Sequence, residues 1–247
     1  MRRALWAILS ALGYFTVLPA GAASAGPAPD AYALSYLPLV GALIGALAGV
    51  SAWGLSYFVP HPLVVAVAFA LPILLTGAIH IDGFLDSCDA VIASVSPQRR
   101  LEIFKDPRHG TFAVAGMAVL SVAWVAALLP VDAWQYPALL ALSGGASRLG
   151  AVGNAFVFPY ARAGELTTQF ESRPSPSVLI VSAVLLAVLA VYVWKWAWLI
   201  CLIVMILQLT AASRIAKRLG GGLVGDVYGF LIVTAEVVIL AAVAGRG

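Results

Sequence analysis

The stretch from Ser177 to Val193 reads SVLIVSAVLLAVLAVYV and carries no charged residue. After a short break at Trp194-Lys195-Trp196, a second apolar run continues to Ala212. A helix that crosses a bilayer needs about 20 mostly apolar residues, and tryptophan is enriched at the membrane surface. Each run therefore predicts a transmembrane α-helix, and the break predicts a short connection at the surface.

Runs of this kind recur along the whole chain. Seven of them are separated by polar or proline-containing joins: Leu34–Val59, Pro62–Ile79, Thr111–Leu129, Pro137–Phe158, Ser177–Val193, Trp196–Ala212 and Leu223–Val243. Charged residues make up 10% of the 247 positions and hydrophobic residues 62%, whereas a soluble domain carries about a quarter charged residues. The mean hydropathy is +1.01. The sequence therefore predicts an all-α, polytopic helical integral membrane protein with about seven transmembrane helices, in which residues 1–247 form a single membrane-embedded domain.

Basic residues lie in short clusters between the apolar runs, and this argues against a nucleic-acid-binding face. The clusters occupy three alternate connections: Arg99, Arg100, Lys105 and Arg108 in the first, Arg162 and Arg173 in the second, and Arg214, Lys217 and Arg218 in the third. Cytoplasmic loops carry the excess of Lys and Arg in membrane proteins. These three connections are therefore predicted to be cytoplasmic, and the C-terminus is predicted to lie outside.

The N-terminal segment permits two interpretations. Arg2-Arg3, an apolar stretch from Ala4 and small residues from Ala20 to Ala25 resemble a secretory signal. Cleavage would leave the mature N-terminus outside and invert every later loop, against the charge pattern. We therefore favour a retained helix that lies in the membrane interface or re-enters on the cytoplasmic side.

Three of the eleven acidic residues fall in the segment His80-Ile81-Asp82-Gly83-Phe84-Leu85-Asp86-Ser87-Cys88-Asp89. If this segment is helical, offsets of four and seven place Asp82, Asp86 and Asp89 on one face, where like charges repel. A divalent cation removes the repulsion, and oxygen ligands suit Mg²⁺, with Mn²⁺ as the alternative ion. Mg²⁺ usually joins carboxylates to substrate phosphates, so the segment predicts a metal site for phosphoryl transfer. The alternative is a solvated acidic helix end.

Neighbouring residues extend the predicted site. His80 is a candidate base or phosphate partner, or an ordinary interfacial histidine. Gly83 leaves room either for a ligand or for close packing of another helix. Asp106 and Arg108 lie in the following loop, beside the start of the next predicted helix, which suits a metal–pyrophosphate complex. An ordinary charged turn is the alternative for this loop.

Other candidates lie in later parts of the chain. Arg148 falls inside an apolar run, and an arginine within a span by default faces the protein interior and marks a site. Arg162, at the cytoplasmic end of that run, is read from the residues alone as a positive-inside membrane anchor. Asp226 follows a glycine-rich segment and adds a fourth carboxylate for a metal or hydroxyl. Glu236 lies near the middle of the last run and needs a partner.

At these residues the sequence resembles the cobalamin synthase family, the adenosylcobinamide-GDP ribazoletransferases. The family's H-x-D-G-x-x-D-x-x-D pattern is met in full by the segment from His80 to Asp89. Further family elements follow in order along nearly the whole chain: Phe15–Pro19, Pro38 with Gly41 and Gly45, Leu101–Asp106, Ser147-Arg148, Tyr160–Arg162 and Gly225-Asp226. The chain departs from the family where Val17 replaces a common arginine, Val224 a polar residue and Val233 a glutamate.

The resemblance implies a membrane-embedded catalytic domain that joins adenosylcobinamide-GDP to α-ribazole, or to its 5′-phosphate, and releases GMP. The product is adenosylcobalamin or its 5′-phosphate, in the late nucleotide-loop assembly step of cobalamin biosynthesis. The resemblance further implies that Asp82, Asp86 and Asp89 hold Mg²⁺ on the pyrophosphate. His80 or Asp106 would take the hydroxyl proton.

The resemblance also implies that Arg108, Arg148, Arg162 and Asp226 contact the substrates. The expected partners are these two substrates and the lipid bilayer, and no nucleic acid. The expected location is the bacterial cytoplasmic (inner) membrane, with the active site on the cytoplasmic side. The sequence leaves open whether the chain forms a homo-oligomer.

Two other functions stay open from the sequence. A CDP-alcohol phosphotransferase that makes phospholipids also uses spaced aspartates and Mg²⁺, but its D-x-x-D-G-x-x-A-R pattern does not fit the spacing here. A cation-coupled transporter would use the acids as ion sites, and Arg148 and Glu236 favour it. Transporter sites usually lie near the bilayer midplane on broken helices, whereas this cluster is predicted at a membrane edge.

Overall fold

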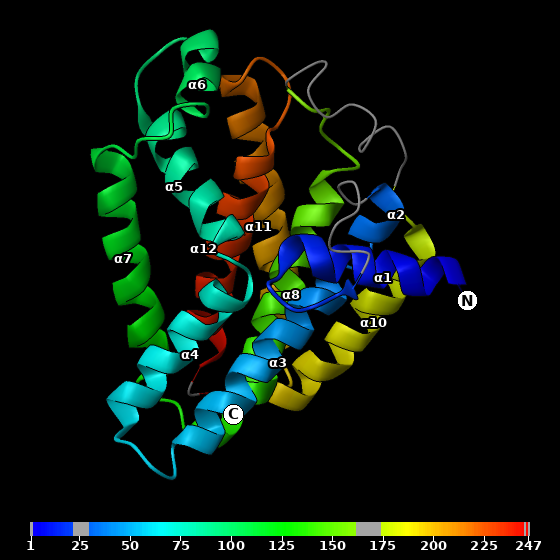
Figure 1. Ribbon diagram of the computed structural model, residues 1–247, viewed down its shortest axis with the longest axis vertical. Coiled ribbons are helices and arrows are strands. Elements are labelled where there is room, and N and C mark those ends of the chain that lie inside the picture. The colour runs from blue at the N-terminus through cyan, green and yellow to red at the C-terminus, as the bar shows by residue number, and fades with distance from the viewer. Residues whose placement is uncertain (1, 22–29, 162–173, 245, 247) are drawn as a thin grey trace.

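The structure is a computed structural model of the chain and describes residues 2–21, 30–161, 174–244 and 246. The described part forms helices and no β-strand (Figure 1). The helices are α1 Arg2–Phe15, α2 Ala31–Leu34, α3 Leu37–Leu55, α4 His61–Leu75, α5 Ile79–Ile92, α6 Pro97–Ile103, α7 Thr111–Leu128, the 3₁₀ turn η2 Ala133–Gln135, α8 Tyr136–Asn154, α10 Pro176–Val193, α11 Ala197–Arg218 and α12 Gly225–Val243.

Five described helices are long and apolar enough to cross a membrane: α3, α7, α10, α11 and α12. Helices α4 and α5 would together make a sixth span, with a bend of 91° between them. The polytopic helical membrane prediction is confirmed, with five or six candidate spans where the sequence indicated about seven. The count differs because the run Pro62–Ile79 extends into the α4–α5 break, and because glycines, serines and Arg148 make α8 less apolar.

Helix α8 lies inside the bundle with most of its residues buried, and it packs against α3, α10, α11 and α12. Gly41, Gly45 and Gly49 lie on the face of α3 that meets it. A Cβ atom at Gly45 would collide with the carbonyl group of Leu140, and one at Gly49 would come 2.5 Å from the Cα of Pro137. Small residues let membrane helices approach this closely, so the glycines set the α3–α8 spacing.

Gly45→Ala is expected to lower the free energy of unfolding by about 1–3 kcal/mol, because the added methyl overpacks the α3–α8 contact. The matched control is Gly54→Ala on the same helix, where a Cβ meets nothing within 4 Å and better helix propensity favours alanine by up to about 1 kcal/mol. Unfolding by sodium dodecyl sulfate titration measures both. Equal stability of the two variants would show that the glycine stripe does not set the spacing.

Several basic residues of the predicted cytoplasmic loops meet at one end of the bundle. Arg100 of α6 donates to the carbonyls of Ala90 and Val91 at 2.6 and 2.8 Å, and Arg218 of α11 donates to Val91 at 3.0 Å. These carbonyls belong to the last turn of α5, where the helix dipole favours cations. The two arginines therefore tie the α5–α6 connection to the end of α11.

The opposite end carries the connections with few basic residues. Trp134 of η2, Tyr192 of α10 and Val243 of α12 line one hollow of about 220 Å³ there. In Figure 1 the C-terminus lies at the lower end and α6 at the upper end. Among the described residues, the first and third basic connections thus lie at one end of the bundle, and η2 lies at the other.

Helix α1 packs against α2 and α3 and runs across the long helices rather than along them (Figure 1). It has 14 residues, fewer than the about 20 needed for a span. The segment after it is joined to the end of α4 by a 2.8 Å hydrogen bond from the N–H of Val17 to the Leu75 carbonyl. The retained helix stays a prediction, and residues 22–29 lie outside the described part.

Candidate active site

The acidic motif begins directly after the break between α4 and α5. The N–H of Ala78 donates to the Ile73 carbonyl at 2.9 Å and that of Gly77 to Leu74 at 3.0 Å, which is the hydrogen-bond pattern of a Schellman helix end. Gly77 and Ala78 both adopt the left-handed conformation, with φ of 58° and 60°. The two residues redirect the chain, so α5 starts with buried His80 in its first turn.

Helix α5 crosses α12 at two glycines. A Cβ atom at Gly83 would lie 2.7 Å from the carbonyl oxygen of Asp226, and one at Gly229 would lie 2.9 Å from that of His80. Neither position accepts a side chain unless the helices move apart. Of the two interpretations of Gly83, close helix packing is therefore the one that the structure favours, and the crossing brings Asp226 beside the motif.

Carboxylates gather at this crossing. Asp82, Asp226 and Asp89 all act electrostatically on Asp86, whose side chain is 16% exposed. In the described part of the chain, no three His, Cys, Asp or Glu side chains come close enough together to hold an ion as one group. The set of Asp82, Asp86 and Asp89 as metal ligands therefore stays a prediction.

Asp89 has a structural role that the sequence did not indicate. Its carboxylate accepts hydrogen bonds from the N–H groups of Gly110 at 2.5 Å and Ala113 at 3.0 Å. These N–H groups lie at the start of α7, so Asp89 on α5 caps that helix. Its negative charge also interacts favourably with the dipole of α7. Each oxygen accepts one hydrogen bond, and a carboxylate has about four lone-pair sites, so the metal role of Asp89 stays a prediction beside this capping role.

Asp106 and Arg108 form a two-point ion pair in the loop before α7. The Nε and Nη2 atoms of Arg108 donate to the two carboxylate oxygens of Asp106 at 2.9 and 2.8 Å. The hydrogen bonds from Arg108 lower the pKa of Asp106 to about 2. A carboxylate held ionised so firmly is a poor general base at neutral pH, which argues against the catalytic role predicted for Asp106.

Asp106→Asn is therefore expected to keep at least about a third of wild-type turnover, because a base with a pKa near 2 contributes little to proton transfer near neutral pH. Since the folded-state pKa is depressed below its ordinary value, Asp106 stays ionised as pH falls until about pH 2. The acid limb of the turnover–pH profile should therefore be the same in wild type and variant. A loss of turnover above about 100-fold would restore Asp106 as the base.

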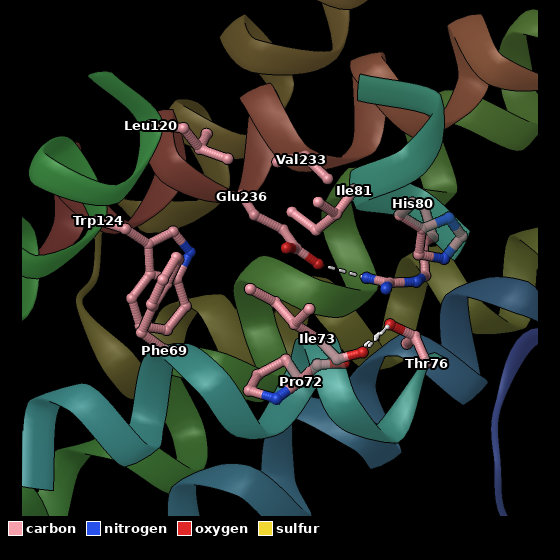
Figure 2. A pocket seen from close by; sticks show the side chains of 11 residues that line it. Phe69, Pro72, Ile73, Thr76, His80, Ile81, Leu120, Trp124, Val233 and Glu236 are labelled. Atoms are coloured by element: carbon pink, nitrogen blue, oxygen red, sulfur yellow. Dashed lines mark hydrogen bonds and ion pairs between the residues drawn. The ribbon is translucent and has the colours of Figure 1, made fainter. Parts of the chain in front are cut away.

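Arg148 has a protein partner inside the bundle. Its Nη1 donates to the Gly144 carbonyl at 2.9 Å and to Oε1 of Glu236 at 2.5 Å, and the two side chains are 5% and 16% exposed. The pair joins α8 to α12, and Figure 2 draws this ion pair as a dashed line from Glu236. Glu236, which needed a partner according to the sequence, is therefore paired with Arg148.

Sequence reasoning missed His109 as a site residue. Its Nδ1 lies 3.5 Å from Oδ1 of Asp86, so the loop before α7 reaches back to the motif. The signal was its position directly after Arg108, in a loop already assigned to the site. Arg162 lies outside the described residues, and so does Arg173 of the same predicted loop.

The family comparison covers all of these residues. The profile of the family described as cobalamin-5-phosphate synthase matches residues 7–244. The chain belongs to this family. A Deinococcus radiodurans relative named adenosylcobinamide-GDP ribazoletransferase is 37% identical over 237 residues, covering 93% of this chain and 82% of that protein. A Pseudomonas aeruginosa relative of the same name is 34% identical over 251 residues, covering 99% of this chain and 100% of that protein.

Membership of the cobalamin-5-phosphate synthase family confirms the resemblance drawn from the sequence. A Bradyrhizobium diazoefficiens relative with the same name is 33% identical over 241 residues, with 95% of this chain and 91% of that protein covered. No solved structure matches this chain.

Proposed function

We propose that this chain joins adenosylcobinamide-GDP to α-ribazole, or to α-ribazole 5′-phosphate, and releases GMP, in the nucleotide-loop assembly step of cobalamin biosynthesis. The family match over residues 7–244 is the observation that carries the proposal. The acidic motif on α5, complete from His80 to Asp89, supports it.

The reaction exchanges the phosphoanhydride bond of the GDP group for a new phosphate ester bond. A ribose hydroxyl of α-ribazole attacks the phosphorus nearest the cobinamide, and the bond to GMP breaks with its electron pair leaving on the GMP phosphate. Charge builds on both phosphates as this bond opens. The protein therefore has to hold the two substrates in line and stabilise negative charge.

Asp82, Asp86 and Asp226 are the carboxylates that we propose hold Mg²⁺, or Mn²⁺, at the α5–α12 crossing. Their donor chemistry fits, because Mg²⁺ takes oxygen ligands and is usually bound by one or two carboxylates together with substrate phosphates. A cage of three carboxylates in the free protein is not required. When bound, the ion would neutralise pyrophosphate oxygens, while these residues fix its position.

Arg108 is the described arginine that we propose contacts substrate phosphate. Its side chain is 85% exposed, and it stands two residues before the N-terminal cap of α7. A planar guanidinium matches phosphate oxygens at two points, so in this role Arg108 would exchange its hydrogen bonds to Asp106 for bonds to phosphate. Arg148 is buried and engaged by Glu236, so we assign it to positioning the helices. For Arg162 the predicted phosphate contact stays a proposal.

Release of GMP tests the function directly. The purified protein in lipid nanodiscs, given adenosylcobinamide-GDP, α-ribazole and Mg²⁺, should form GMP and the joined corrinoid in equal amounts. A CDP-alcohol phosphotransferase would instead release CMP from a CDP-alcohol, and a transporter would carry cations into vesicles without either substrate. CMP release or substrate-free cation flux, with no GMP, would overturn the proposal.

We also propose that the end of the bundle with Arg100 and Arg218 faces the cytoplasm of a bacterial inner membrane, with the active site on that side. Single cysteines at positions 132 and 195 should then react with an impermeant maleimide from outside, and one at position 98 should not. The native Cys88 and Cys201 are buried, so they contribute little background. The reverse labelling pattern would invert the proposed orientation.

A further inference from the structure

A small cavity lies below the break between α4 and α5. The volume within which the centre of a water molecule can lie is about 30 Å³. Its wall consists mainly of apolar side chains, with four polar residues gathered on it (Figure 2). The lining residues are Phe69, Pro72, Ile73, Thr76, His80, Ile81, Leu120, Trp124, Arg148, Val233 and Glu236. They come from α4, α5, α7, α8 and α12, so the cavity lies where the elements that carry the site meet.

His80 presents an unpaired nitrogen in this region. Its side chain is buried, with the residue 7% exposed, and its Nε2 has no hydrogen-bond partner among the described residues. The ring packs against Phe15, with centroids 6.1 Å apart, so it cannot turn to reach solvent without losing that contact. A buried polar atom without a partner is costly and is usually satisfied by protein or by ordered water.

The other polar groups on the wall can complete such a hydrogen-bond network. The hydroxyl of Thr76 donates to the Pro72 carbonyl at 2.8 Å, so its oxygen can still accept a bond. The Arg148–Glu236 pair supplies guanidinium N–H groups and carboxylate oxygens. An ordered water needs about 10–15 Å³ of such space and two to four polar partners. This partly open cavity has the space, and its lining includes the polar groups of Thr76, His80, Arg148 and Glu236.

We propose that the cavity is a binding site for one or two water molecules that bridge His80 to Thr76 and to the Arg148–Glu236 pair. The bridge fixes the His80 ring in the first turn of α5, and with it the direction in which the acidic motif leaves the break. Thr76 and Glu236 are then positioning residues. The kinetic part of this inference rests on the proposed function, whereas the water site itself does not.

Water contact with His80 is measured first, without substrates, on ¹⁵N-histidine-labelled protein in nanodiscs. The chain has three histidines, so His61→Gln and His109→Gln assign the signals. Wild-type protein should show a cross-peak between water and the His80 ring, and exposed His109 provides the positive control. A His80 ring without this cross-peak, in a spectrum where His109 shows one, would overturn the proposal.

A matched pair of threonines tests the bridge. Thr76→Val removes a hydroxyl that lines the cavity, while Thr234→Val removes one that lies outside it and likewise bonds within its own helix, to the Phe230 carbonyl at 2.6 Å. Thr76→Val should weaken the water cross-peak of His80 and move its ring nitrogen signals, and Thr234→Val should change neither. Equal responses of the two variants would contradict the bridge.

Turnover gives the functional readout. Thr76→Val is expected to lower kcat for GMP release about 3–10-fold, with KM for both substrates unchanged within about twofold. The reason is that the variant still binds both substrates, but the aspartates of α5 are no longer aligned for the reaction. Thr234→Val should keep wild-type kcat. A loss in KM alone would contradict the positioning role. Wild-type protein that releases no GMP but shows the His80 water cross-peak would overturn the proposed function and leave the water site standing.

Discussion

Asp86→Asn is expected to lower the rate of GMP release about 10²–10³-fold, the usual effect of removing one group that stabilises charge in a transition state. Asp86 lies at the centre of the carboxylate group, where Asp82, Asp226 and Asp89 all act on it electrostatically. The amide keeps the shape of the side chain and its fold, but removes the negative charge that a cation requires. Turnover measured over a Mg²⁺ series should therefore show both a lower maximum and a higher Mg²⁺ requirement.

Asp132→Asn is the control for Asp86→Asn, because Asp132 is exposed next to η2, at the opposite end of the bundle. It should leave turnover and the Mg²⁺ requirement at wild-type values. Thermal unfolding in detergent should be unchanged in both variants. An Asp86→Asn protein with wild-type turnover at every Mg²⁺ concentration would remove Asp86 from the proposed metal site.

Arg148→Met is expected to lower the free energy of unfolding by about 3–5 kcal/mol, the range for breaking a buried ion pair by removing one partner. Methionine keeps most of the volume of the arginine stem, so the lost charge accounts for the main effect. Glu236 would be left as a carboxylate that is 16% exposed, without its cation. Unfolding by sodium dodecyl sulfate titration in mixed micelles measures the change.

The double variant Arg148→Met with Glu236→Met should recover most of that loss. Replacing a buried ion pair by apolar residues of similar volume is often neutral, and the shortfall from additivity measures the coupling between the two residues. Additive losses would show that the pair contributes no coupling energy. A single variant with wild-type stability would show that Arg148 is balanced by some group other than Glu236.

The sequence predicted the helices well, because the signal for a membrane helix is local. An uninterrupted run such as Ser177–Val193 permits hardly any other structure, and α10 follows it within one residue at its start. The break after α4 was less visible, since Gly77 and Ala78 sit inside a continuous apolar run. Their left-handed conformation depends on hydrogen bonds back to Ile73 and Leu74, which composition does not reveal.

For the carboxylates too, the sequence predicted the local arrangement and the tertiary structure revealed the distant contacts. The spacing of Asp82, Asp86 and Asp89 predicted a shared helical face, and all three do lie on α5. Spacing could not reveal that Asp89 caps α7, because its partner Ala113 is 24 residues away and on another helix. Asp226 was a candidate from its residue type and from the family resemblance, and only the close crossing at Gly83 places it beside the motif.

By itself, then, the sequence determined that the chain is a helical membrane protein, where most helices run, which family it belongs to and which acidic motif it carries. The helices and the acidic motif follow from hydrophobicity and spacing within about 20 neighbouring residues, whereas the family follows from a resemblance along nearly the whole chain. The tertiary structure decided that Arg148 pairs with Glu236, 88 residues further along, and that Gly83 serves helix packing. Such contacts join distant segments, and their geometry exists only once α3, α5, α8 and α12 have packed against one another.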